Sequence, residues 1–157
     1  MNTLLLTLSL MMTSILSFPL SGKILANGSQ TSATRIIDLI IKNTNVSPMF
    51  DTVDNIKEGS GETLIKGIVV CMFPTMEVLK EAVNKNCNLI ISHEPLYYNH
   101  LDNKVQIQNI KVFQEKQRYI IDHNLVIWRF HDYVHEMNPD LILLGMIEKF
   151  DWNDYLI

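Results

Sequence analysis

The sequence has few cysteines and lacks the common catalytic signatures. Its two cysteines, Cys71 and Cys87, each lie in or beside an apolar run, which favours buried free thiols over a disulfide. It contains no nucleophile elbow, no phosphate-binding Gly-Lys-Ser/Thr loop, no dinucleotide fingerprint and no His-Glu-x-x-His helix. With those patterns absent, the polar residues that follow the predicted strands are the main functional signal.

Basic clusters are absent as well. The chain has 13 basic and 17 acidic residues and a net charge of −4, which disfavours a nucleic-acid-binding surface. Its 157 residues suggest one domain, and 47% hydrophobic with 19% charged residues is typical of a globular protein. There is no internal repeat, low-complexity tract or linker to a second domain.

The first 30 residues differ from the rest because they carry almost no charge. The apolar run from Leu4 to Leu16 resembles the central region of a secretory signal, and it is short for a membrane span. We expect residues 1–26 to be a signal peptide cleaved after Ala26, with Gly22 as an alternative position. The mature protein would then be exported, either periplasmic or secreted, without a stable membrane span. An uncleaved anchor and a buried helix are the alternatives.

Helical and strand patterns alternate after the signal. The predicted helices lie near 33–43, after Thr75, across 105–123 and over Leu141–Ile147. The predicted strands lie near 65–72, 88–92 and 125–129. Residues 50–61 are expected to form a loop whose carboxylates are solvated; an approach of these carboxylates to a site is the alternative. Strand–helix–strand spacing predicts parallel strands with right-handed crossovers. We therefore expect an α/β domain over residues 33–157, with three layers and a partly parallel sheet flanked by helices.

Two polar clusters follow neighbouring predicted strands, and four of the five histidines lie in them. One cluster runs from His93 to His100 and includes Glu94; the other contains His131, Asp132 and His135. The carboxyl ends of parallel strands share one edge of the sheet, where ligands of open α/β folds bind. Imidazole and carboxylate groups are typical metal ligands. The candidate metal ligands are His93, Glu94, His131 and His135, with His131 or Asp132 in a supporting role.

Several of these residues also have purely structural interpretations. His131 and Asp132 can pair simply to fix a loop, and Arg129 is expected to form an ion pair with a nearby carboxylate. His123 is expected to be structural, because it lies at the C-terminus of a predicted helix. It also precedes its strand, which is expected to put it at the opposite edge of the sheet. Glu94 is the candidate catalytic residue, as a general base if it does not bind metal.

The two clusters resemble those of the Nif-three-like family, also known as GTP cyclohydrolase I type 2 homologues. Members usually carry a paired His-His where this chain has His93 and Glu94 after an apolar strand. Many members have a His followed four residues later by an Asp, where this chain has His131 and His135. Over residues 33–155 the chain looks like an exported branch of this family. The resemblance implies a Nif-three-like fold, a dinuclear metal site and a homo-oligomer.

Three departures from the family pattern bear on function. Glu94 replaces the second His and His135 replaces the Asp, so each exchange leaves a residue able to bind metal. The divalent metal could be zinc, manganese or iron. The family continues into a second half that supplies another His and Glu, so we expect this sequence to represent the first half only. Either the chain is a truncated product or its site is completed from outside it.

The leading hypothesis is a metal-dependent, hydrolase-like protein similar to GTP cyclohydrolase I type 2. It would act on a small-molecule ester, phosphate or amidine-type carbon, with the substrate itself unidentified. The alternatives are a non-catalytic metal-binding or assembly protein, and an inactive remnant of a longer gene.

Overall fold

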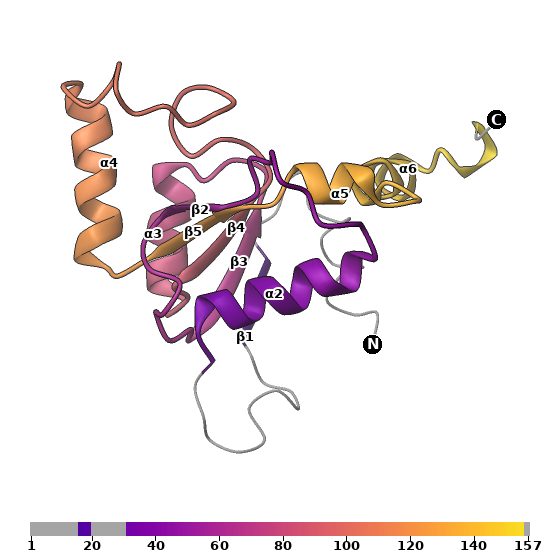
Figure 1. The fold of residues 1–157 in the computed structure, drawn as a ribbon, viewed down its shortest axis with the longest axis horizontal. Helices are drawn as coiled ribbons and strands as arrows, with labels where there is room; N and C mark the ends of the chain where they lie inside the picture. The colour runs from indigo at the N-terminus through magenta and orange to yellow at the C-terminus, as the bar shows by residue number, and fades with distance from the viewer. Residues whose placement is uncertain (1–15, 20–30, 156–157) are drawn as a thin grey trace.

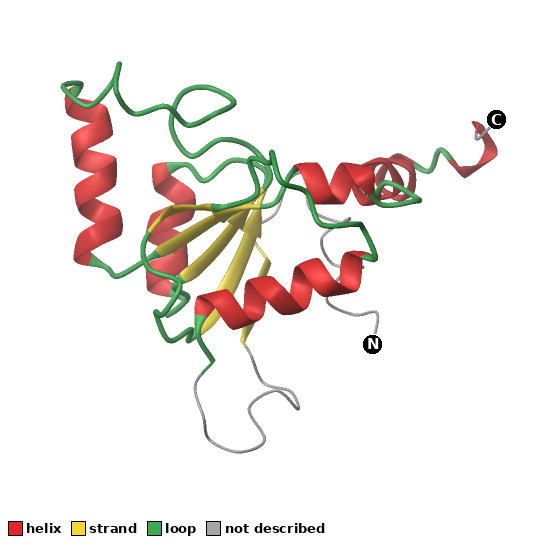
Figure 2. Ribbon diagram, viewed as in Figure 1, coloured by secondary structure: helices red, strands yellow, loops and turns green. Residues whose placement is uncertain are grey.

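The computed structural model describes residues 16–19 and 31–155, which form a five-stranded mixed sheet with helices on both faces (Figures 1 and 2). The strand order is β1-β3-β4-β5-β2. The parallel central strands are β3 (Gly67–Cys71), β4 (Leu89–Ser92) and β5 (Val126–Arg129). The antiparallel edge strands are β1 (Leu16–Pro19) and β2 (Ile56–Glu58). The predicted α/β fold with a partly parallel sheet is therefore confirmed.

The central strands are buried on both faces, which explains why their sequences are continuous apolar runs. Side chains alternate between the faces, so Leu89 and Ile91 of β4 belong to one core while Ile90 belongs to the other. All three are at most 3% exposed.

Helices cover both faces of the sheet (Figure 1). Helix α2 (Ala33–Thr44) packs Ile36, Ile37 and Ile40 into the same core as Leu89 and Trp128. On the other face lie α3 (Met76–Asn84) and α4 (Lys111–Asp122). Their buried residues Leu79 and Ile120 share a core with Ile90 and Ile127.

The last elements extend beyond the carboxyl edge of the sheet (Figure 1). They are the short helix α5 (Asp132–Glu136), helix α6 (Leu141–Phe150) and the 3-10 turn η2 (Asn153–Tyr155). The side chain of Asp140 accepts hydrogen bonds from Ile142 and Leu143 N–H, which explains why α6 begins there. Among the described residues, no helix has both the length and the apolar character needed to cross a membrane.

Three local predictions were wrong. The helix expected across 105–123 covers only Lys111–Asp122, because Asn103 accepts a bond from Val105 N–H and the following residues form tight turns. The predicted loop at 50–61 contains strand β2, which pairs with the open edge of β5. Residues 65 and 66 lie outside β3, because the Asn88 side chain bonds the Lys66 N–H and the Leu64 carbonyl.

Most of the predicted signal peptide lies outside the described residues. Within residues 1–26 only Leu16–Pro19 are described, as strand β1 paired antiparallel with β3. Both cysteines are free and buried, as the sequence predicts.

Candidate metal centre

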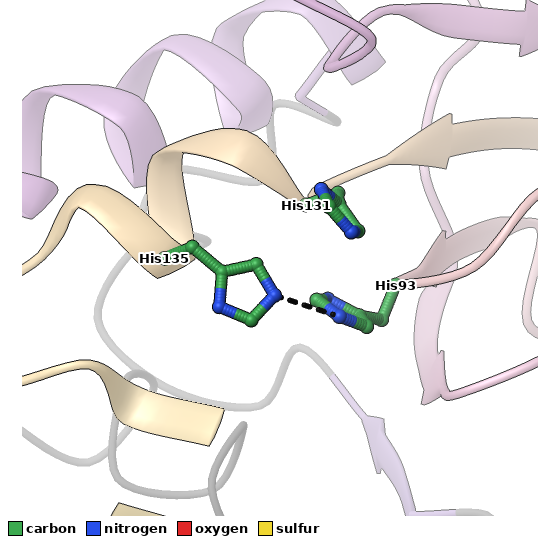
Figure 3. A group of neighbouring side chains, drawn as sticks. All are labelled: His93, His131 and His135. Carbon is green, nitrogen blue, oxygen red and sulfur yellow. Dashed lines mark hydrogen bonds between the residues drawn. The ribbon is translucent and has the colours of Figure 1, made fainter. Parts of the chain in front are cut away.

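Three histidines converge at the carboxyl edge of the sheet (Figure 3). His93 follows β4, His131 follows β5, and His135 lies one turn further along α5. The Nε2 atoms of His93 and His135 are 3.2 Å apart, and the rings of His93 and His131 stack with centroids 4.6 Å apart. One nitrogen from each ring lies within 4.8 Å of the others, so the three residues could hold a metal ion.

Local structure explains why these residues meet. The i, i+4 spacing of His131 and His135 puts both rings on the same face of the short helix α5. The pairing of β4 with β5 continues past the strand ends, where Phe130 N–H donates to the Ser92 carbonyl at 2.9 Å. His93 N–H in turn donates to the Cys71 carbonyl at 3.1 Å, which holds the start of the loop against β3.

The other nitrogen of each ring is already occupied. The Nδ1 atoms lie close to oxygen atoms that can only accept a hydrogen bond: the Phe130 carbonyl at 3.3 Å from His93, the Asp132 carboxylate at 2.8 Å from His131, and the Asp140 carboxylate at 2.7 Å from His135. Each Nδ1 must therefore carry the proton. In the neutral rings the Nε2 lone pairs are left free to bind a metal.

The electrostatics of the site favour a neutral His93 and ionised carboxylates at Asp132 and Asp140. Burial, together with the charges of His131 and His135, lowers the pKa of His93 to about 4. Burial opposes ionisation of Asp132, but hydrogen bonds from the Val53 N–H and from the His131 ring outweigh it and lower its pKa to about 2. The pKa of Asp140 is also lowered, because its bonds to the His135 ring and to the N-terminus of α6 outweigh burial.

A buried carboxylate, Asp54, holds α5 in position. Asp54 is 7% exposed and accepts the backbone N–H groups of His131, Asp132 and Tyr133 at 2.7, 2.9 and 2.9 Å. Thr52 Oγ1 donates to Asp132 at 2.8 Å from the same segment. The sequence prediction of solvated carboxylates is wrong for Asp54, which is buried, whereas Asp51 of the same segment is exposed.

The prediction of solvated carboxylates is also wrong for Glu58. Its side chain is 12% exposed and accepts hydrogen bonds from Tyr97 Oη at 2.8 Å, Lys104 Nζ at 2.6 Å and Gln117 Nε2 at 3.0 Å. These bonds attach the loop after β4 to β2 and α4 and do not involve the histidines. They explain how a carboxylate is accommodated there.

Glu94 lies next to a buried arginine. Its Oε2 is 3.9 Å from Nη2 of Arg129, and its side chain is 32% exposed. Arg129 is fully buried and donates from Nε to the His93 carbonyl at 3.1 Å. The structure thus brings His93, His131 and His135 together and places Glu94 beside Arg129, in the ion pair expected for that arginine.

The remaining two histidines differ in their relation to the centre. The exposed ring of His100 meets that of His131 edge to face, with centroids 5.5 Å apart. His123 lies at the end of α4, where it stacks on Tyr119 and its Nδ1 is 2.9 Å from the Tyr119 carbonyl. The sequence placed His100 in the right loop without assigning it a role.

Comparisons with known proteins agree on one family. Residues 33–135 match the Duf34/NIF3 (NGG1p interacting factor 3) family. A GTP cyclohydrolase 1 type 2 homolog from Clostridium acetobutylicum is 39% identical over 49 residues, covering 31% of this chain and 18% of that protein.

Solved structures show the same fold. The Staphylococcus aureus protein SA1388 is 21% identical with a TM-score of 0.55, over 67% of this chain and 29% of that one. A Bacillus cereus protein related to NIF3 is 22% identical with a TM-score of 0.54, over 68% of this chain and 29% of that one. This chain spans less than a third of the length of each of these three proteins. With the family match extending over residues 33–135, the chain belongs to the Duf34/NIF3 family.

Proposed function

We propose that the chain binds a divalent metal ion through the Nε2 atoms of His93, His131 and His135. One observation carries the proposal: Nε2 of His93 and Nε2 of His135 are 3.2 Å apart although neither carries a proton in the neutral ring. Two lone pairs at that distance repel each other, and a cation between them removes the repulsion.

The distance between the Nε2 atoms of His93 and His135 fits two ligands of one metal ion. Two nitrogens bound at 2.0–2.1 Å to one tetrahedral zinc lie about 3.3 Å apart. The carboxylates that bind His131 and His135 at Nδ1 are the usual outer partners of metal-binding histidines, because they fix the tautomer and raise the basicity of the ring. An all-imidazole set suits zinc and also accepts iron, whereas manganese prefers oxygen ligands.

We further propose a hydrolase-like activity on a small molecule. A divalent ion held by three imidazoles supplies Lewis acidity and acidifies water. Of this chain's own residues, Glu94 follows His93 directly and is partly exposed, which supports a role as an additional ligand or as a general base. Arg129 would orient Glu94. The name of the Clostridium relative supports this class of activity without identifying the substrate.

Metal content of matched variants tests the binding proposal. The full chain is loaded with zinc, desalted and analysed by elemental mass spectrometry. His93→Ala and His135→Ala should lose most of the metal, whereas His123→Ala should retain it, because His123 lies at the other end of the adjoining strand. Equal metal content in all three variants would contradict the proposal.

A non-catalytic metal-binding or assembly role is the second candidate. It rests on the three imidazoles alone, which can hold a metal ion whether or not a substrate reacts beside it. A screen of the zinc-loaded chain with phosphate and carboxylic esters separates the two. Turnover that disappears in His93→Ala supports the hydrolase; stable metal with no turnover supports the second role.

Export and self-assembly are further proposals from the sequence. Intact-mass analysis of exported protein should show the loss of residues 1–26, and retention of Met1 would contradict export.

Sedimentation of the purified chain should show an oligomer, and a monomer at all concentrations would contradict assembly.

A further inference from the structure

A fourth imidazole lies beside the three histidines without belonging to their group. The ring of His100 is exposed and stands at 80° to the ring of His131, with centroids 5.5 Å apart. The group that could hold a metal contains only His93, His131 and His135 among the described residues. His100 is therefore placed next to the centre but free for another role.

Arg129 decides which nitrogen of His100 carries the proton. Its guanidinium is fully buried, and Nη2 lies 3.4 Å from Nδ1 of His100. A guanidinium can only donate, so Nδ1 of His100 must accept and Nε2 must carry the proton in the neutral ring. The assignment is the opposite of that in His93, His131 and His135, whose Nδ1 atoms face acceptors.

The same arginine fixes the loop that carries His100. Its Nη1 donates to the His100 carbonyl and its Nε to the His93 carbonyl. The loop between them is closed by Asp102, which is 6% exposed and accepts the N–H groups of Leu96 and Tyr97 at 3.2 and 2.8 Å. The Nε2–H of His100 is thus presented by a braced backbone rather than by a free loop.

The buried guanidinium of Arg129, next to His100, is the positive charge that attracts an anionic partner. Among the described residues, the ion-pair partner of Arg129 is Glu94 at 3.9 Å, so the buried guanidinium is only loosely neutralised. The nearby carboxylate of Asp54 is instead occupied by three backbone N–H groups, and that of Asp132 by Val53 N–H, Thr52 and the His131 ring.

We infer that His100 is a substrate-binding residue whose Nε2–H donates a hydrogen bond to an anionic oxygen, of phosphate or carboxylate, at the three-histidine centre. The inference rests on the proposed metal site and deepens it by naming the class of ligand. The three imidazoles that bind metal offer lone pairs, and the fourth offers a proton to an oxygen held beside them. Arg129 acts on this ligand through His100, as a positioning residue.

The tautomers can be observed directly, without any metal. Long-range proton–nitrogen NMR of the metal-free full chain near neutral pH distinguishes Nδ1–H from Nε2–H rings. We expect His93, His131 and His135 to show the Nδ1–H form and His100 to show the Nε2–H form. A His100 ring in the Nδ1–H form would overturn the inference, whatever the metal content.

Binding of simple anions provides the second test. Inorganic phosphate and acetate are titrated into the zinc-loaded chain by calorimetry, and the tighter of the two indicates the class of substrate. Because hydrogen bonds to charged groups contribute about 1.5–3 kcal/mol, His100→Ala should weaken anion binding at least about tenfold. His100→Gln retains a donor close to the position of Nε2 and should recover much of the affinity.

Controls separate this inference from the metal proposal. His123→Ala should leave anion affinity unchanged, and His100→Ala should keep the zinc. Loss of zinc in His100→Ala would show that His100 is a metal ligand and would overturn the inference, as would anion affinity that is unchanged in His100→Ala. If the wild-type chain binds no zinc, the metal proposal fails, and the same titration with the metal-free chain decides whether His100 binds the anion.

Discussion

Replacing Asp54 by asparagine tests whether a buried carboxylate holds helix α5 in place. One carboxylate oxygen accepts the N–H groups of His131 and Asp132, and the other accepts that of Tyr133. The substitution keeps the size of the side chain but turns one acceptor into a donor. At least one backbone N–H at the start of α5 then loses its partner.

The expected loss of stability follows from two opposing effects. A buried donor left without a partner costs about 1–3 kcal/mol. Burial is the largest effect on Asp54 and raises its pKa above the usual value, so a neutral amide recovers part of this cost. We expect the free energy of unfolding to fall by about 1–2 kcal/mol.

The same substitution should weaken metal binding. His131 and His135 both lie on the segment that Asp54 anchors, so we expect zinc affinity to fall, by up to about the 10–100-fold that loss of a direct partner of a metal-binding ring costs. Urea denaturation of the metal-free chain and competition with a zinc chelator measure the two effects. Asp51→Asn is the matched control, since Asp51 is exposed and three residues away. Our assignment of Asp54 would be refuted if both variants behaved alike in both assays.

Three further perturbations have defined outcomes. Burial and the neighbouring histidines lower the pKa of His93 from 6.5 to about 4. The unfolded chain therefore binds the proton first, and the free energy of unfolding of the metal-free protein should fall as pH drops from 6.5 to 4, by about 2 kcal/mol after allowance for screening. His93→Gln should reduce this fall, and an equal fall in the variant would contradict the role of His93. Burial raises the pKa of Cys71 to about 12, so its thiol should resist alkylation at pH 8 until urea unfolds the chain, and rapid labelling of the native protein would contradict this. Gly59 has φ +88, and an added Cβ would lie 2.4 Å from the Leu125 carbonyl oxygen. Gly59→Ala should therefore lower the free energy of unfolding by more than about 2 kcal/mol, and an unchanged denaturation midpoint would disprove the argument.

Much of the architecture could be predicted because it depends on local patterns. The apolar runs that became β3, β4 and β5 are bounded by prolines or polar residues, and the helices between them show periodic apolar positions. Parallel connection then determines that all three strands end at one edge. The sequence could therefore predict that histidines following β4 and β5 face the same region.

Local patterns failed where a distant partner decides the conformation. Strand β2 forms because β5 offers an unpaired edge, which residues 56–58 alone do not reveal. The predicted helix lost its first residues because the side chain of Asn103 competes for a backbone N–H.

The details of the site were likewise decided by tertiary structure. Asp54 and the backbone groups that it accepts are 77 to 79 residues apart, so only packing distinguishes it from its exposed neighbour Asp51. The sequence by itself determined that the histidines after β4 and β5 gather at the carboxyl edge, because parallel connections place both loops there. Only the folded chain decided which nitrogen of each ring is free, because a tautomer depends on the atom that faces Nδ1: an acceptor for His93, His131 and His135, and the Arg129 guanidinium for His100.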